Sequence, residues 1–192
     1  MNGQVVLYQG ERVYSSEIPT ETVERFHQMV KEDGYGLTAY NDKEFYLVES
    51  SSGAKDAYGF IHTNPPALKE DFYKENPINM MLFISLPPAE EKYKVAFPNL
   101  DFLRNTPYSV DVISKGNSKA EGIKRFLEHL DQEDAETYAF GDGPNDIEML
   151  QAVTHPVAMG NALPVLKEIA EFITTNNTDN GIVNGLKHYG LI

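Results

Sequence analysis

The sequence predicts an α/β protein with a parallel sheet in its C-terminal part and a smaller α+β domain before it. The main observation is a change of pattern near Tyr108. After Tyr108, short apolar stretches alternate with helical stretches, and this alternation is typical of a parallel sheet with helices on its faces. Before Tyr108, β-rich stretches separated by short polar segments indicate an antiparallel sheet. We therefore expect a domain boundary at about this residue.

The N-terminal part begins with a predicted hairpin, because short strands at 5–8 and 11–14 are joined by a tight turn. Residues 19–31 predict a helix, since apolar residues recur there at helical spacing and Gly34 follows as a stop signal. The other elements expected before the boundary are strands at 36–40, 44–48, 78–86 and 102–104, and helices at 67–75 and 90–96.

The C-terminal part is expected to be a parallel sheet that begins with a strand at 110–113. The segment after this strand, 118–130, has apolar residues at the spacing of a helix face. The further elements expected are strands at 137–140, 156–158 and 172–173, and helices at 146–152, 163–170 and 181–189.

The composition is strongly acidic, since 16 Lys and Arg stand against 29 Asp and Glu and give a formal net charge of -13. The electric field of this negative charge repels nucleic acid and anionic lipid, so we expect neither as a partner. A ligand that carries phosphate would need a local cation to overcome this field. The absence of cysteine excludes disulfides, zinc-thiolate sites and thiol nucleophiles. Without a recognisable targeting segment or a membrane-spanning apolar run, we expect a cytoplasmic protein.

The loop over 114–119 leads into a predicted helix and ends in Lys119. Ser118 and Glu121 have the spacing of a capping box, which places Lys119 at the first helical position. The helix dipole is positive there, so a lysine is unfavourable unless an anion binds at the same end. The alternative is a solvated lysine whose stem reaches away from the dipole, and this loop taken alone favours that interpretation.

A second loop, at 141–146, lies between an apolar strand and a helix and has the sequence Gly-Asp-Gly-Pro-Asn-Asp. Glycines let the backbone approach a ligand, and carboxylates at the end of a strand suit a hard cation such as Mg²⁺. The alternative takes Asn145 as a helix cap paired with Glu148, and Asp142 as a turn residue. We favour a ligand site because two carboxylates, one carboxamide and two glycines fall within six residues.

This loop and the following Ile-Glu-Met-Leu at 147–150 resemble the GDGxND-x-x-ML signature of Cof-type phosphatases of the haloacid dehalogenase (HAD) superfamily. Further matches follow in the family's order at Ser118-Lys119, 158–162 and 176–181, and the hairpin over 1–14 is also similar. The resemblance implies a partial Rossmann-like core and a smaller α+β cap. The implied domains are a core hairpin segment at 1–17, a cap at 18–108 and the C-terminal part of the core at 109–192.

The resemblance also implies roles for individual residues. Asp142 would coordinate a catalytic Mg²⁺, and Asp146 would support the metal shell and orient the lysine. Lys119 would neutralise charge on the phosphate and the nucleophile, and Asn145 would contact the phosphoryl group. These roles agree with phosphoryl transfer, which depends mostly on positioning and charge stabilisation. The implied substrate is a small phosphorylated metabolite, such as a sugar phosphate, a nucleotide or a cofactor phosphate.

The sequence departs from the family pattern at the nucleophile. The family attacks phosphorus with the first Asp of an Asp-x-Asp-Gly-Thr segment, and the 192 residues contain no such segment. We therefore expect a fragment or truncated form of a Mg²⁺-dependent phosphatase, inactive by the family route. Its magnesium site would be weak or absent, because the family places two more ligands on that segment.

A parallel sheet without its first strand would expose an apolar slot and unpaired backbone groups. A homodimer could fill that gap by exchanging elements between its subunits. A rival function is a non-catalytic phosphate-binding or assembly module that associates through the incomplete sheet. A third alternative, in which both loops are only caps and turns, leaves the ordered set of motifs as a coincidence.

Overall fold

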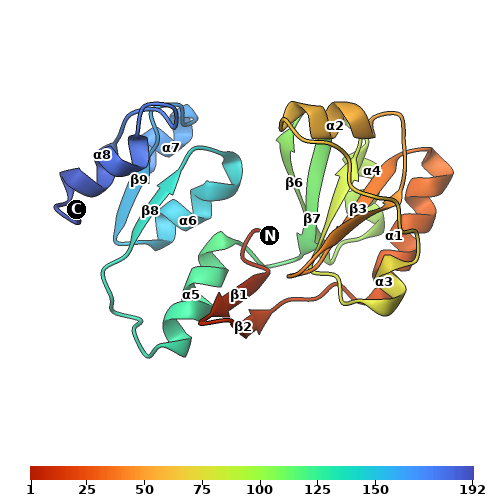
Figure 1. The fold of residues 1–192 in the computed structure, drawn as a ribbon, viewed down its shortest axis with the longest axis horizontal. Coiled ribbons are helices and arrows are strands. Elements are labelled where there is room, and N and C mark those ends of the chain that lie inside the picture. Colours follow the sequence, from red (N-terminus) through yellow and green to blue (C-terminus); the bar gives the residue numbers. More distant parts are fainter. The chain divides into compact units, whose positions relative to one another are not determined.

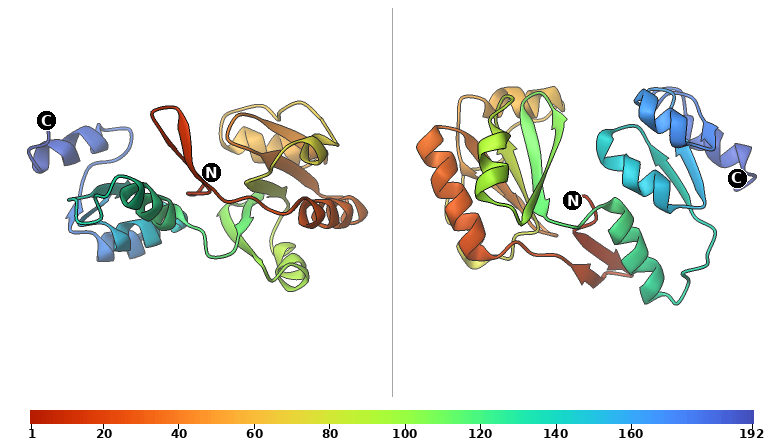
Figure 2. Two further views of the ribbon diagram at one scale, coloured as in Figure 1. Left: turned by 90° about the horizontal axis from the view of Figure 1, so that it is seen from below. Right: turned by 180° about the vertical axis from the view of Figure 1, so that it is seen from behind.

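The structure is a computed structural model that describes residues 1–192. The chain forms two compact units, Met1–Asn117 and Ser118–Ile192, each with its own β-sheet (Figures 1 and 2). The α/β class expected from the sequence, with a parallel sheet and a cap, is confirmed. None of the helices combines the length and the hydrophobicity needed to cross a membrane.

The first unit opens with the expected hairpin, in which β1 (Val5–Tyr8) pairs antiparallel with β2 (Glu11–Ser15). The two residues of the turn, Gln9 and Gly10, have φ angles of 50° and 87°. Positive φ at both central residues is the requirement of a type I′ turn, one of the two turn types whose twist matches that of the paired strands.

The rest of the first unit is built on a sheet with the strand order β4-β3-β5-β7-β6. Every neighbouring pair in this sheet is antiparallel. The strands are β3 (Gly36–Tyr40), β4 (Phe45–Glu49), β5 (Met80–Ile84), β6 (Leu100–Thr106) and β7 (Ser109–Ser114).

The prediction that the strand at 110–113 begins the parallel sheet is wrong. This strand is β7, which pairs antiparallel with both β5 and β6. The physical reason is local, since only Pro107 and Tyr108 separate β6 from β7 and so short a connection joins antiparallel strands. We therefore propose that the cap includes β7, so that its boundary lies after Tyr108.

Helices cover both faces of this sheet. α1 (Thr20–Asp33), α3 (Phe72–Glu75) and α4 (Glu90–Ala96) belong to one face, where they enclose the main apolar core with strand residues such as Met81 and Phe83 (Figure 1). α2 (Ala54–Phe60) packs a smaller cluster against Leu82 and Ile84. Alternate residues of β5 thus face opposite cores, as the period of a strand requires.

The structure differs from the sequence analysis of this unit at one expected helix and at one helix that was not expected. The helix expected at 67–75 is reduced to α3 (Phe72–Glu75), because the backbone before it pairs with Leu47, which donates to Ala67 O and accepts from Lys69 N. The helix α2 (Ala54–Phe60) was not predicted, because the serine and glycine residues just before it, at 50–53, favour a loop.

Asn117, which follows β7, and Asn79, which precedes β5, both bond to the end of the hairpin. Asn117 accepts a hydrogen bond from Tyr14 Oη at 2.6 Å and donates to Ser16 Oγ at 3.1 Å. The Asn79 amide donates to Ser15 Oγ at 2.9 Å and to Ser16 O at 2.7 Å. We call these four contacts the clasp, because they fix together the segments at which the chain enters and leaves the antiparallel sheet.

The second unit contains the expected parallel sheet, with the strand order β10-β9-β8. Its small apolar core includes Ala139, Leu150 and Leu166. In chain order the elements are α5 (Lys119–His129), β8 (Tyr138–Gly141), the 3-10 turn η1 (Pro144–Asp146), α6 (Ile147–Ala152), β9 (His155–Ala158), α7 (Pro164–Ile169), β10 (Phe172–Ile173) and α8 (Gly181–His188).

We predict that Phe26→Ala strongly destabilises the first unit. The Phe26 ring is 0% exposed and contacts Phe83 and Tyr93 at centroid distances of 5.7 Å and 5.0 Å. Loss of such a ring from a close-packed core costs about 3–5 kcal/mol. Urea unfolding followed by tyrosine fluorescence measures the change. The control is Val95→Ala, whose side chain is 84% exposed, and an equal loss for both variants would contradict this core.

Candidate functional site

The candidate site is formed where β8 and β9 end side by side. Gly141 and Ala158 are partners in the parallel register, and Met159 N donates to Gly141 O at 3.0 Å. The loops that follow these strands therefore leave the same edge of the sheet. In open parallel sheets this edge, at the carboxyl ends of the strands, is where ligands bind.

Asp146 organises the first of these loops. Its Oδ2 accepts hydrogen bonds from the backbone amides of Asp142 at 2.9 Å and Gly143 at 3.0 Å. Its Oδ1 accepts from Lys119 Nζ at 2.5 Å. A Cβ on Gly141 would lie 2.6 Å from the Cβ of Asp146, so a glycine is required at the end of β8 for this carboxylate to fit.

The surroundings of Asp146 favour its charged form. Burial raises the pKa of Asp146, but the hydrogen bonds from Lys119 Nζ and from the amides of Gly143 and Asp142 outweigh it, so the pKa of Asp146 lies below its usual range. Ser118 caps α5 by accepting from Glu121 N at 3.3 Å, which confirms the predicted N-cap. Lys119 is the first residue of α5, and its unfavourable place near the positive helix end is offset by the carboxylate of Asp146.

Asp142 differs from Asp146 because its side chain is exposed. Its Oδ2 accepts from Asn161 Nδ2 at 2.8 Å, and Asn161 Oδ1 in turn accepts from Asn177 N at 3.0 Å. The three loops after β8, β9 and β10 are thus connected through Asn161. Sequence reasoning did not single out Asn161, although it lies within the motif at 158–162.

Asn145 lies in the same loop and is half-buried. The interpretation of Asn145 as a helix cap is wrong, because Gly143 is the N-cap of η1 and Asp146 is the N-cap of α6. A Cβ on Gly143 would approach Asn145 Oδ1 to 3.1 Å. Asn145 is therefore not the N-cap of either helical segment.

Glycines also permit close backbone contact in the two later loops. A Cβ on Gly160 would lie 2.6–2.8 Å from atoms of Asn176 and Thr175, and one on Gly181 would lie 2.3 Å from Thr175 O. Gly160 N donates to Thr175 O at 3.0 Å. These approaches account for the glycines of the motifs at 158–162 and 176–181 by packing.

The residues present make only part of a magnesium site. The chain contains no group of three or more His, Cys, Asp or Glu side chains arranged to hold a metal ion. Both oxygens of Asp146 have partners, whereas the carboxylate of Asp142 is exposed. Mg²⁺ requires near-octahedral oxygen coordination, so the 192 residues do not satisfy it by themselves.

The comparisons with known proteins show the family to which this chain belongs. The sequence profile of the haloacid dehalogenase-like hydrolases matches residues 1–186. YkrA, a putative phosphatase of Bacillus subtilis (strain 168), is 35% identical over 192 residues, which cover 100% of this chain and 74% of YkrA. The chain therefore belongs to the haloacid dehalogenase-like hydrolases. The expected likeness to phosphatases of the Cof type is confirmed as well.

Solved structures show the same relationship. A hypothetical protein from Geobacillus kaustophilus HTA426 superposes with a TM-score of 0.88 at 32% identity, over 100% of this chain and 75% of that protein. BT4131, a sugar phosphatase of HAD subclass IIB, superposes with a TM-score of 0.85 at 28% identity, over 100% of this chain and 75% of its own. Both likenesses extend over the first and the second unit of the fold.

We predict that Asp146→Asn destabilises the second unit at neutral pH and much less in acid. The pKa of Asp146 is lowered on folding, so its stabilising contribution is complete above the unfolded-state pKa of about 3.9 and is lost as pH falls through the folded-state pKa. Because the carboxylate is 7% exposed, we expect a loss of about 2–3 kcal/mol at neutral pH.

Urea unfolding at several pH values measures this loss, with Asp142→Asn as the matched control. The exposed carboxylate of Asp142 should contribute less than about 0.5 kcal/mol to stability. Equal effects of the two substitutions, or an effect of Asp146→Asn that persists below the folded-state pKa, would contradict the assigned contacts.

Proposed function

We propose that these residues form the phosphate-binding and metal-supporting half of a Mg²⁺-dependent phosphatase that acts on small phosphorylated metabolites. The observation that carries the proposal is the ion pair between Lys119 Nζ and Asp146 Oδ1 at 2.5 Å. It holds a cation at the beginning of α5 and joins it to the loop that contains Asp142 and Asn145. Membership of a family of hydrolases supports the same reaction class.

Each residue has a role in this proposal. Lys119 would stabilise negative charge on the phosphoryl oxygens, and Asp146 would keep it in position, since the lysine has donors to spare beyond this one bond. Asn145 would donate its amide to an oxygen of the substrate. Asp142 would provide one oxygen ligand to Mg²⁺, which when bound would neutralise charge on the phosphoryl group.

The nucleophile and the remaining metal ligands would have to come from outside these residues. The 192 residues contain no Asp-x-Asp-Gly-Thr segment and no group of three or more His, Cys, Asp or Glu side chains that could hold a metal ion. Phosphoryl transfer needs an attacking group in line with the leaving group. We therefore propose that residues 1–192 alone do not hydrolyse phosphate esters.

We predict that the purified chain does not release p-nitrophenol from p-nitrophenyl phosphate in the presence of Mg²⁺. Its rate should equal the background rate and the rates of Asp142→Ala and Lys119→Ala, because none of the three proteins has a nucleophile. Absorbance of the released phenolate measures the rate. Turnover that both substitutions abolish would show that another carboxylate of this chain attacks phosphorus.

We also predict that inorganic phosphate binds at the beginning of α5. In ¹⁵N-labelled protein, phosphate should shift the amide signals of Lys119, Asp142 and Gly143. Lys119→Met should weaken binding about tenfold, or 1.4 kcal/mol, because a charge-assisted hydrogen bond is lost. The control is Lys124→Met on the same helix, whose side chain is 62% exposed. Equal effects of the two substitutions would contradict the role of Lys119.

The substrate class is proposed from the relatives and from chemistry. BT4131 is a sugar phosphatase, and a sugar phosphate is a small dianion whose charge Lys119 could meet within an otherwise acidic chain. The net charge of -13 argues against nucleic acid and anionic membranes as partners. A cytoplasmic location suits both the absence of cysteine and a metabolite substrate.

The alternative function is a non-catalytic phosphate-binding or assembly module. It is favoured by one observation, namely that β8 is an edge strand of the parallel sheet. An edge strand presents unpaired backbone groups that can pair with a strand of another chain, including a second copy in a homodimer. Because both proposals expect no turnover by residues 1–192, self-association in solution through β8 is the observation that would favour this alternative.

A further inference from the structure

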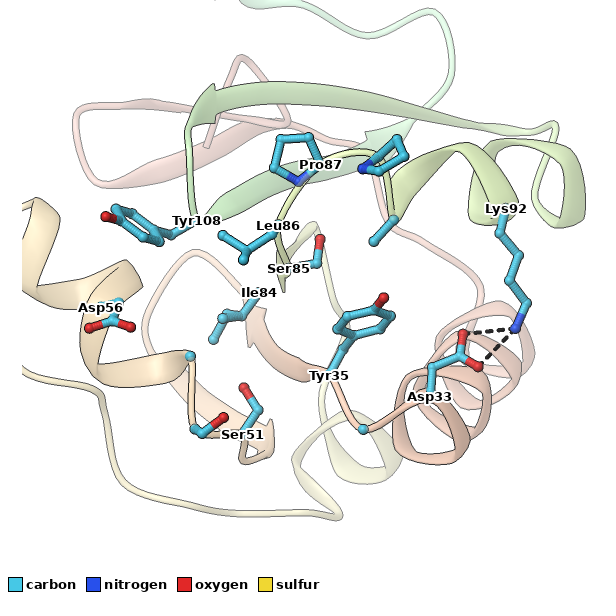
Figure 3. A pocket seen from close by; sticks show the side chains of 15 residues that line it. Asp33, Tyr35, Ser51, Asp56, Ile84, Ser85, Leu86, Pro87, Lys92 and Tyr108 are labelled. Carbon is cyan, nitrogen blue, oxygen red and sulfur yellow. Dashed lines mark hydrogen bonds and ion pairs between the residues drawn. The ribbon is translucent and has the colours of Figure 1, made fainter.

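The first unit contains a cavity of about 710 Å³ that the proposed phosphatase chemistry does not use. Figure 3 shows it between the loop after β4, the end of β5 and the ends of α1 and α4. Its volume is in the range of about 300–1,000 Å³ that is typical of pockets for small molecules. Every lining residue belongs to the unit Met1–Asn117.

The cavity lies at the end of the antiparallel sheet away from the clasp. Gly36 at the start of β3 pairs with Ile84 at the end of β5. Ile84 lines the cavity, and Gly36 follows Tyr35, which also lines it. The clasp residue Asn79 precedes the first residue of β5. The length of β5 therefore separates the cavity from the point where the chain enters and leaves the sheet.

One side of the cavity is apolar. Ile84, Leu86 and Tyr108 lie on this side in Figure 3, together with Pro87. The Leu86 side chain is 61% exposed, so a ligand seated against it would cover apolar surface. Burial of apolar surface is favourable, so this wall would hold a flat or branched apolar group.

The other side carries one satisfied ion pair. Lys92 Nζ donates to both oxygens of Asp33 at 2.8 Å, and Tyr93 Oη donates to Asp33 Oδ2 at 2.9 Å. The hydrogen bond from Lys92 lowers the pKa of Asp33 below its usual range. This pair is neutral as a whole and leaves little attraction for a further charge.

Asp56, by contrast, lines the cavity without an opposite charge. Its carboxylate has no ion pair or hydrogen bond in the structure. The hydroxyls of Tyr35 and Ser51 also lack hydrogen-bond partners, and the Tyr35 ring is held edge-on against Phe83 at 5.4 Å. A Cβ on Gly36 would lie 2.6 Å from Ser51 Oγ, so the glycine makes room for this hydroxyl.

We propose that this cavity binds a small organic amine. Its ammonium group would face the carboxylate of Asp56, its apolar body would cover Leu86 and Tyr108, and polar substituents would meet the hydroxyls of Tyr35 and Ser51. With Asp33 neutralised by Lys92, the lining carries a net negative charge, which disfavours phosphate and carboxylate ligands. The site is independent of the proposed phosphatase function.

The test uses three matched probes that share a phenyl group: 2-phenylethylamine, 2-phenylethanol and 3-phenylpropionate. Titration of the ¹⁵N-labelled chain at neutral pH should shift the amide signals of Gly34, Ser52 and Gly53. The amine should bind about fivefold more tightly than the alcohol, as expected for one partly exposed charge pair. The carboxylate should bind more weakly than the alcohol.

Two variants and one control make the result specific. Asp56→Asn should bring the affinity for the amine down to that for the alcohol, and Leu86→Ser should weaken both. Asp134→Asn, an exposed substitution in the second unit with the same change in net charge, should leave all three affinities unchanged. The proposal is overturned if no probe shifts the cavity amides, if the carboxylate binds as well as the amine, or if Asp56→Asn leaves the affinity for the amine unchanged.

Discussion

The carboxylate of Asp146 is the group on which the second unit depends most. Its two oxygens accept from the amides of Asp142 and Gly143 and from Lys119 Nζ, so one side chain shapes a loop and attaches that loop to a helix that begins 27 residues earlier in the chain. The position of this carboxylate requires a glycine at 141, because a Cβ there would collide with Asp146. Backbone shape, charge and the position of the cation are therefore consequences of one buried anion, and none can change without the others.

The two units rely on different forces. The first has an extended aromatic core around Phe26, so apolar packing accounts for a large share of its order. The second has a smaller core, so polar contacts between its loops account for a larger share of its order. This division suits a phosphatase of the haloacid dehalogenase-like family, because the loops that would meet the phosphate must present polar groups at the sheet edge. In the proposed site, Lys119 would provide the local positive charge that an acidic chain needs in order to bind an anion.

Much of the fold could be predicted from local signals. The hairpin at Gln9-Gly10, α1 with its stop at Gly34, and α4 (Glu90–Ala96) follow from turn residues and periodicity. The alternation of apolar and helical stretches did not predict the pairing of β7, because this strand pairs with β6 across the short turn at Pro107-Tyr108. Among the site residues, the motif indicated the loop of Asp142 and Asp146, but not the bridging amide of Asn161. Such a contact depends on which loops meet in space, and a single sequence does not contain that information.

The clasp has a consequence for how this chain can evolve. Asn117 bonds to Tyr14 and Ser16, and Asn79 bonds to Ser15 and Ser16, so the two ends of the antiparallel sheet domain meet at one place. A domain whose ends are adjacent behaves as an insertion, and its interior can lengthen, shorten or be exchanged without moving the segments that flank it. If the loops after β8 and β9 bind phosphate as proposed, selection can alter the antiparallel domain while those loops stay unchanged, which is one physical route by which a single reaction extends to many substrates.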